Sequence, residues 1–179
     1  PVLFVPFAGQ FARVGQRIMI AWKDSRESAR AVAGEMPPDE YLNAGRRYMK
    51  EERFGEAIEM FRQVTARNAR NWQAFNYLGR AYAALGHFED ARENYERAIA
   101  IEYNYASAHF NLATCFEKMG KLDKALDRWR QYVEVGQTIG EREEWMEHAR
   151  KRVAELEQQF GRREELDDEK DWNDDGEFR

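Results

Sequence analysis

The sequence predicts an all-α protein built from stacked helix hairpins, and three observations lead to this prediction. A pattern of small and aromatic residues recurs three times at a spacing of 34 residues, a period typical of two-helix repeats. Four prolines in 179 residues leave most of the chain free to form helices. Hydrophobic residues at 43% beside charged residues at 34% fit helices with one buried and one solvated face.

Composition also narrows the classes of function. The formal net charge of −5 argues against a nucleic-acid binder, because affinity for phosphate comes from concentrated Lys and Arg. No apolar run approaches the roughly 18 to 20 residues that span a bilayer. The single cysteine, Cys115, excludes an internal disulfide and a cysteine-based zinc cluster. We therefore expect one domain with tails, in the reducing cytoplasm, with no membrane or nucleic-acid partner.

Residues 1–35 do not fit the repeat and are expected to form a separate N-terminal segment. Two short buried strands are predicted from VLFVPF and RIMIAW, followed by a helix that Asp24 or Ser25 caps. Residues 1–22 are apolar, basic and free of acids, as in an import leader, but they lack the serines and the cleavage-site pattern of one. We therefore do not expect a targeting role.

This segment resembles the junction of tandem universal stress proteins, where the last strand of one domain leads into the first strand and helix of the next. Lys23 stands where that family has an acidic residue, and the family's glycine-rich phosphate loop is missing. The resemblance therefore does not imply ATP binding.

The three repeats are expected at 36–71, 72–105 and 106–139, with helices at 38–50, 54–67, 72–84, 88–101, 106–118 and 122–135. Pro38 suits the first turn of a helix. The first repeat turns at Glu52 and Arg53, and Gly86 and Gly120 suit helix ends in the other two turns.

The recurring columns contain small residues, which let two helices approach closely, and aromatic residues, which fill the gaps beside them. The small columns are Gly45, Gly79 and Ala113, then Ala57, Ala91 and Ala125; the aromatic columns are Tyr41, Phe75 and His109, then Tyr48, Tyr82 and Phe116, then Phe61, Tyr95 and Trp129. This pattern resembles the tetratricopeptide-repeat (TPR) family. The resemblance implies a TPR α-solenoid, a right-handed superhelix of helix hairpins that binds a peptide or helix of another protein on its concave face.

After the third repeat, Gly136 and Gly140 are expected to break the chain before a capping helix at 140–161. Apolar residues recur there at threes and fours and form one stripe: Trp145, Ala149, Val153, Leu156 and Phe160. A stack of repeats leaves its last apolar face open, and such a helix usually covers it.

Residues 162–179 are expected to be an acidic tail without structure. Asp171, Asn173, Asp175 and Gly176 match the opening of an EF-hand loop, but the glutamate of its twelfth position would fall past Arg179. No calcium site is therefore expected.

The first helix of each repeat is expected to line a peptide-binding groove that is basic, rich in amides and partly aromatic. Its residues are Asn43, Arg46, Lys50, Gln73, Asn76, Tyr77, Arg80, Ser107, Phe110, Asn111, Thr114 and Lys118. Amides can bond a peptide backbone and arginines can hold carboxylates, so an acidic protein or peptide partner is expected. Two alternatives stay open: a merely solvated face, and a self-assembling scaffold whose groove receives a segment of a neighbouring copy, such as its acidic tail.

Well-known members of the TPR family hold chaperone tails with a clamp of Lys, Asn and Arg residues. Those columns fall here on Leu42, Arg46, Tyr77, Ser107 and Asn111, and none has the residue of the clamp. We therefore do not expect this chain to hold such tails in that way.

No enzyme, cofactor or metal site is expected. His87, His109 and His148 have no partner at metal-ligand spacing. Cys115 lies within a predicted helix beside an aromatic residue, as a buried and inert thiol would. The sequence contains no phosphate loop, H-E-x-x-H or G-x-S-x-G motif.

Overall fold

The computed structural model describes residues 25–26, 30 and 36–172, and the side chains up to residue 162. In this part of the chain seven helices follow one another, and no strand occurs. They are α2 (Pro38–Lys50), α3 (Phe54–Arg67), α4 (Trp72–Ala84), α5 (Phe88–Ile101), α6 (Ala106–Lys118), α7 (Leu122–Ile139) and α8 (Glu143–Trp172). The predicted strands, most of the stretch that resembles universal stress proteins and most of the EF-hand-like sequence lie outside the described residues.

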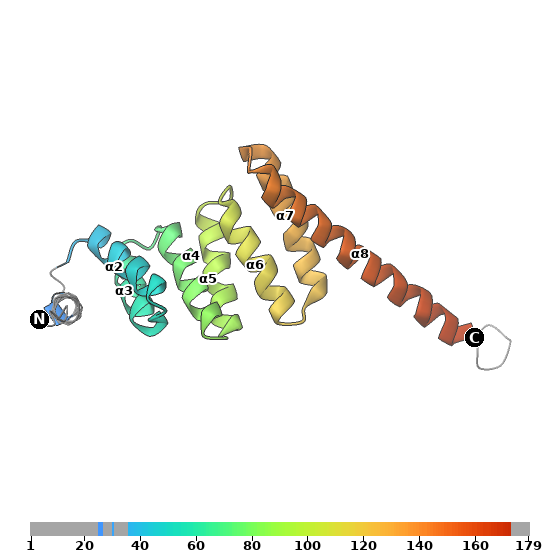
Figure 1. The fold of residues 1–179 in the computed structure, drawn as a ribbon, viewed down its shortest axis with the longest axis horizontal. Helices are drawn as coiled ribbons and strands as arrows, with labels where there is room; N and C mark the ends of the chain where they lie inside the picture. Colours follow the sequence, from blue (N-terminus) through green and yellow to red (C-terminus); the bar gives the residue numbers. More distant parts are fainter. Residues whose placement is uncertain (1–24, 27–29, 31–35, 173–179) are drawn as a thin grey trace, which may run out of the picture.

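The helices pair into three hairpins, α2 with α3, α4 with α5 and α6 with α7, which stack side by side in chain order (Figure 1). The prediction of an all-α solenoid is confirmed in this part of the chain. The first five helices also begin and end at the predicted residues. None of the described helices is long and apolar enough to cross a membrane.

The small columns allow each hairpin to close on an aromatic ring. A Cβ atom at Gly45 would lie 2.5 Å from the ring of Phe61, and one at Gly79 would lie 2.5 Å from the ring of Tyr95. Ala91, which faces inward from α5, is fully buried. The spacing of small residues in the sequence therefore sets how closely the two helices of a hairpin pack.

The turn inside each hairpin uses a left-handed residue at the same repeat position. Gly86 and Gly120 adopt φ values of 78° and 70°, and Glu52 adopts 58° in the first repeat. Glycine takes this conformation without steric cost, whereas other residues are strained by about 1–2 kcal/mol. The first hairpin therefore turns under strain where the other two do not.

The end of the third hairpin differs from the prediction. Gly136 does not break the chain, because α7 continues through it to Ile139 and ends at Gly140, whose φ is 70°. Gly136 is buried, and a side chain there would clash with the sulfur of Met146 on α8. Gly136 therefore allows a close contact between α7 and α8. In the sequence, a glycine at such a contact looks the same as a glycine that ends a helix.

Helix α8 packs on α7 and then runs out beyond the repeats (Figure 1). Met146, Ala149 and Leu156 are its buried residues. The predicted stripe was wrong at Trp145, whose exposed fraction is 38%. The prediction of an unstructured tail from residue 162 was also wrong for its first part, because α8 continues to Trp172.

One carboxylate joins α8 to the hairpin before it. Glu117 of α6 accepts a hydrogen bond of 2.6 Å from the indole Nε1 of Trp129 and one of 3.1 Å from Nε of Arg152 on α8. Arg130 of α7 and Glu157 of α8 form a second ion pair, of 2.7 Å. These contacts fix α8 against the last repeat.

Candidate functional site

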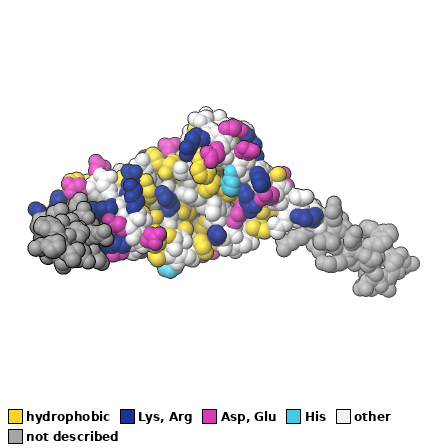
Figure 2. All heavy atoms as spheres, viewed as in Figure 1, with side chains coloured by type: hydrophobic (Ala, Val, Ile, Leu, Met, Phe, Trp, Pro, Cys, Tyr) yellow, Lys and Arg dark blue, Asp and Glu magenta, His cyan; other side chains and the backbone are white. Residues whose placement is uncertain are grey.

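The first helix of each hairpin contributes to one surface, which we call the inner face and define as the exposed side chains of α2, α4 and α6. α4 lies between α2 and α6 and contacts both. α4 contains no acidic residue and α6 contains one, Glu117, whose carboxylate is occupied by Trp129 and Arg152. Figure 2 shows basic and acidic side chains on the repeats, and several acidic ones close to the turn from α7 to α8.

Four predicted groove residues of the inner face are exposed cations: Arg46, Lys50, Arg80 and Lys118. Within the described part of the chain, no carboxylate lies within ion-pair distance of any of them. The charge of these side chains is therefore open to solvent and to a ligand.

Arg46 and Arg80 occupy the same position in consecutive repeats, and the stack brings both to one aromatic ring. Their guanidinium carbons lie 5.7 Å and 5.5 Å from the ring centre of Tyr77. That ring in turn stacks on Phe61, at 5.1 Å between centroids. A ring face attracts a cation without neutralising it, so Tyr77 orients the two guanidinium groups and leaves their charge available.

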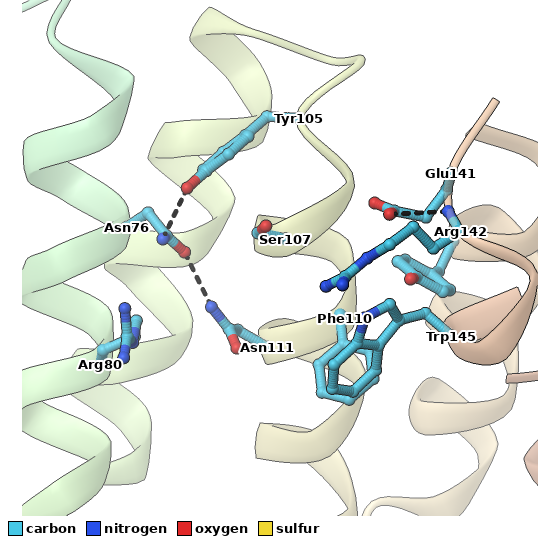
Figure 3. A pocket seen from close by; sticks show the side chains of 10 residues that line it. Asn76, Arg80, Tyr105, Ser107, Phe110, Asn111, Glu141, Arg142 and Trp145 are labelled. Atoms are coloured by element: carbon cyan, nitrogen blue, oxygen red, sulfur yellow. Dashed lines mark hydrogen bonds between the residues drawn. The ribbon is translucent and has the colours of Figure 1, made fainter. Parts of the chain in front are cut away.

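A chain of hydrogen bonds crosses the inner face between α4 and α6. Nδ2 of Asn111 donates to Oδ1 of Asn76 at 2.9 Å, and Nδ2 of Asn76 donates to the hydroxyl of Tyr105 at 3.1 Å (Figure 3). Asn76 is 2% exposed. Sequence reasoning placed Asn76 among the peptide contacts, but its burial and its two bonds indicate that it positions Asn111 instead.

A cavity of about 360 Å³ opens beside this chain, where α4 and α6 meet the turn before α8 (Figure 3). Its lining combines aromatic rings, amides, two cations and one carboxylate. The lining residues are Asn76, Arg80, Tyr105, Ser107, Phe110, Asn111, Tyr132, Glu141, Arg142 and Trp145.

The predicted groove residues divide between this cavity and its surroundings. Asn76, Arg80, Ser107, Phe110 and Asn111 line the cavity, whereas Asn43, Arg46, Lys50, Gln73, Tyr77, Thr114 and Lys118 do not. Thr114 uses its hydroxyl on the carbonyl of Phe110, at 3.0 Å. Asn43 and Gln73 are exposed, so both amides can reach a ligand.

Sequence reasoning missed half of the cavity: Tyr105, Tyr132, Glu141, Arg142 and Trp145. Glu141 and Arg142 come from the turn that follows Gly140, and Trp145 comes from the start of α8. The repeat period describes neither segment. One signal in the sequence was available. Neighbouring residues of a helix point to different faces, so Trp145 and Met146 could not both face α7, and one of the two had to border another surface.

The aromatic part of the cavity is rigidly built around Phe110. Its ring lies edge-on to Trp129, Tyr132 and Trp145, with centroid distances of 5.0, 5.6 and 5.6 Å. Burial raises the pKa of Tyr132 to about 12, and nearby Glu141 adds to this shift, so its hydroxyl stays neutral. The guanidinium of Arg142 lies 5.9 Å from the ring centre of Trp145.

Cys115 and His109, two groups that could perform other chemistry, are buried in the core. Burial raises the pKa of Cys115 to about 11, and its sulfur lies 3.3 Å from the carbonyl of Phe88. Burial lowers the pKa of His109, whose Nε2 donates to the carbonyl of Tyr103 at 2.8 Å. The thiol is therefore protonated and weakly nucleophilic. The described residues contain no group of three or more His, Cys, Asp or Glu able to hold a metal ion.

Comparison with known proteins places the repeat region in a family. Models described as "Tetratricopeptide repeat" match residues 42–99 and 107–135, and one described as "TPR repeat" matches residues 79–120. The peroxisomal targeting signal receptor of Kluyveromyces lactis is 28% identical over 99 residues, which cover 54% of this chain and 18% of that protein. Protein bimA of Emericella nidulans is 23% identical over 100 residues, covering 56% of this chain and 12% of the relative. The chain thus matches less than a fifth of each relative's length.

Solved structures share the fold at low sequence identity. The TPR2B domain of yeast Sti1, in a complex with pHsp70, superposes with a TM-score of 0.64 at 16% identity and covers 68% of this chain and 97% of that one. The Yersinia enterocolitica type III secretion chaperone SycD, in complex with a peptide of the translocator YopD, gives a TM-score of 0.65 at 15% identity, over 68% and 92% of the two chains.

Proposed function

The chain is a tetratricopeptide-repeat protein, and from this premise we propose that its inner face binds an acidic segment of a partner protein. The observation that carries the proposal is the pair of cations, Arg46 and Arg80, that Tyr77 orients and that no described carboxylate neutralises.

The chemistry of these side chains selects the ligand. Guanidinium groups stay charged at any physiological pH and hold carboxylates through two parallel hydrogen bonds. The exposed amides of Asn43 and Gln73 each offer a donor and an acceptor, which suit the peptide groups of a bound segment. Carboxylates along an extended or helical segment would therefore satisfy the inner face.

The solved neighbours support the class of ligand. SycD was solved with a peptide of YopD, and the TPR2B domain of Sti1 in a pHsp70 complex. At this low identity the similarity supports a common fold but does not indicate which partner binds. The expected chemistry of the partner is therefore inferred from Arg46 and Arg80.

The test is selection of binders from a displayed library of random nonapeptides, followed by fluorescence anisotropy with the selected peptides. The wild-type chain should enrich sequences rich in Asp and Glu. Arg46→Glu combined with Arg80→Glu should weaken binding by about a hundredfold or more, because two charge-assisted contacts of about 1.5–3 kcal/mol each are lost. The circular dichroism spectrum of the double variant should remain that of a helical protein.

The matched control reverses two exposed cations away from the inner face, Arg97 of α5 and Lys124 of α7. Neither belongs to an ion pair among the described residues, so both substitutions should leave fold and binding intact. Binding that survives the Arg46 and Arg80 reversal but is lost in the control would place the partner on another face. Light scattering with and without residues 164–179 tests whether the ligand is the tail of a second copy.

A further inference from the structure

We propose that the cavity beside Trp145 receives one large apolar side chain of the bound segment, next to a carboxylate that binds Arg142, with Arg80 as the second cation of the lining. This inference rests on the proposed function of the inner face and names a second feature of its ligand. The ligand class is therefore an acidic peptide with an apolar anchor, and not acidic peptides in general.

The apolar wall of the cavity is a tryptophan that stays partly open. The indole of Trp145 is 38% exposed, although the neighbouring Met146 and Ala149 of α8 are buried. Edge-on contact with Phe110, at 5.6 Å, fixes its orientation. A rigid aromatic face that borders a cavity loses little conformational freedom on binding, which is why such rings serve as anchors in protein interfaces.

Two cations of the lining come from different sides of the cavity. Arg80 reaches it from α4 and Arg142 from the turn before α8 (Figure 3). Among the described residues neither guanidinium has a carboxylate partner. The one lining carboxylate, Glu141, accepts the backbone N–H of Arg142 at 2.9 Å. The lining therefore carries two cations and one carboxylate, and this excess of positive charge favours an anionic ligand.

The remaining polar group matches a peptide backbone. Asn111 donates to Asn76, which leaves its carbonyl oxygen without a hydrogen bond among the described residues. That oxygen can accept a peptide N–H at the cavity. A volume of about 360 Å³ lies near the lower end, roughly 300 Å³, of ligand sites. The space therefore suits one side chain with its adjoining peptide units.

The position of the cavity determines where the apolar residue of the ligand lies relative to its acidic residues. Arg80 belongs both to the cavity and to the pair of cations around Tyr77, so a segment that lies on the inner face passes Arg80 before it meets Trp145. The turn before α8 closes this end of the face. The apolar residue therefore follows or precedes the acidic ones directly, within a single bound segment.

The experiment repeats the nonapeptide selection with the full chain and with Trp145→Ala. Wild-type binders should combine Asp or Glu with an adjacent Leu, Met or aromatic residue, and replacing that residue by Ala should weaken binding about tenfold. Trp145→Ala should lose the apolar preference and keep the acidic one. Trp145→Phe, which preserves an aromatic face, should retain both.

Further variants and peptides separate the outcomes. Arg142→Gln should weaken the binding of peptides that carry the apolar residue and its neighbouring carboxylate. Peptides that lack both should be affected less. Amidated and free C-termini show whether the carboxylate is terminal or a side chain. Selected acidic peptides that bind equally well with Ala in place of the apolar residue would overturn this inference alone. If no acidic peptide is enriched, the proposed function fails and this inference fails with it.

Discussion

Two arginines of one hairpin show how differently the same residue type is used on the two sides of the repeat. Arg92 of α5 pairs with Glu89 at 3.0 Å, with Glu96, and with Glu93 at 3.7 Å. Arg80 of α4 has no carboxylate partner among the described residues and lies over Tyr77. Glu89 and Glu96 stand three and four positions from Arg92, where helical side chains meet. α4 has none.

This difference indicates where function lies. A charge that its own helix neutralises contributes little field at the surface, whereas an uncompensated one attracts ligands of opposite sign. The lowered pKa of Glu89, caused first by its hydrogen bond to Lys121 and then by that to Arg92, reports the same neutralisation. The following predictions test whether the outer helices provide stability and the inner ones provide binding.

The largest expected effect is on the buried side of the outer helix. Ala91→Leu should destabilise the fold by about 1–3 kcal/mol, because Ala91 is fully buried and a larger side chain forces the hairpin apart. Thermal melting measures the loss. A melting temperature equal to that of the parent would contradict the helix register assigned to this repeat.

A smaller loss is expected from the carboxylate that joins α8 to α6. Glu117→Gln should cost about 1–2 kcal/mol, because Arg152 and Trp129 lose a charged acceptor in a half-buried site. Urea unfolding gives the free energy. Intrinsic fluorescence should also change, since Trp129 donates to this carboxylate. An unchanged spectrum and midpoint would show that Glu117 does not hold α8 and that its packing and the Arg130–Glu157 ion pair suffice.

The two arginines themselves should affect stability very little. Arg92→Gln and Arg80→Gln should each change the free energy of unfolding by no more than about 0.5 kcal/mol, as is usual for surface positions. Peptide binding should separate them, with a loss of about tenfold or more only in Arg80→Gln. Equal affinities for the two variants would remove the distinction between the inner and outer faces.

The smallest expected effect is a dependence on pH that comes from neither face. The fold lowers the pKa of His109 by burial, so below the unfolded value of roughly 6.5 the unfolded chain binds the proton first. Stability contributed by this residue is therefore complete above that pH and declines as the pH falls. The second repeat has a phenylalanine, Phe75, at the position of His109. The melting temperature of His109→Phe should therefore fall less between pH 7.5 and 5.5 than that of the parent. A drop as large as in the parent would assign the effect to other groups.

The repeats were predictable from the sequence because each helix contact recurs with the period. Gly45 and Gly79 meet Phe61 and Tyr95 in the same way one repeat apart, so one pattern locates both contacts. A capping helix was also expected from the sequence, but the way it packs could not be predicted, because its contacts occur only once. Gly136 packs against Met146, and nothing in a period of 34 residues distinguishes that contact from a helix end.

The candidate site divides along the same line. Arg46 and Arg80 could be paired from their common repeat position, and the structure brings both to Tyr77. Trp145 and Arg142 escaped because their place depends on the left-handed turn at Gly140 and on how α8 docks. Burial of Asn76 was equally hidden, since its amide resembles those of exposed neighbours in the sequence.

Arg46 and Arg80 occupy the same position in consecutive repeats, so the stack sets the distance between the two cations of the inner face. Packed helices lie about 8–10 Å apart, and an extended peptide advances about 3.3 Å per residue. Two cations one repeat apart, both beside the ring of Tyr77, therefore match acidic residues about three positions apart in an extended ligand. The register of the partner's acidic residues, more than their number, would then decide which segments fit, because the third repeat has Thr114 at this position and offers no further cation.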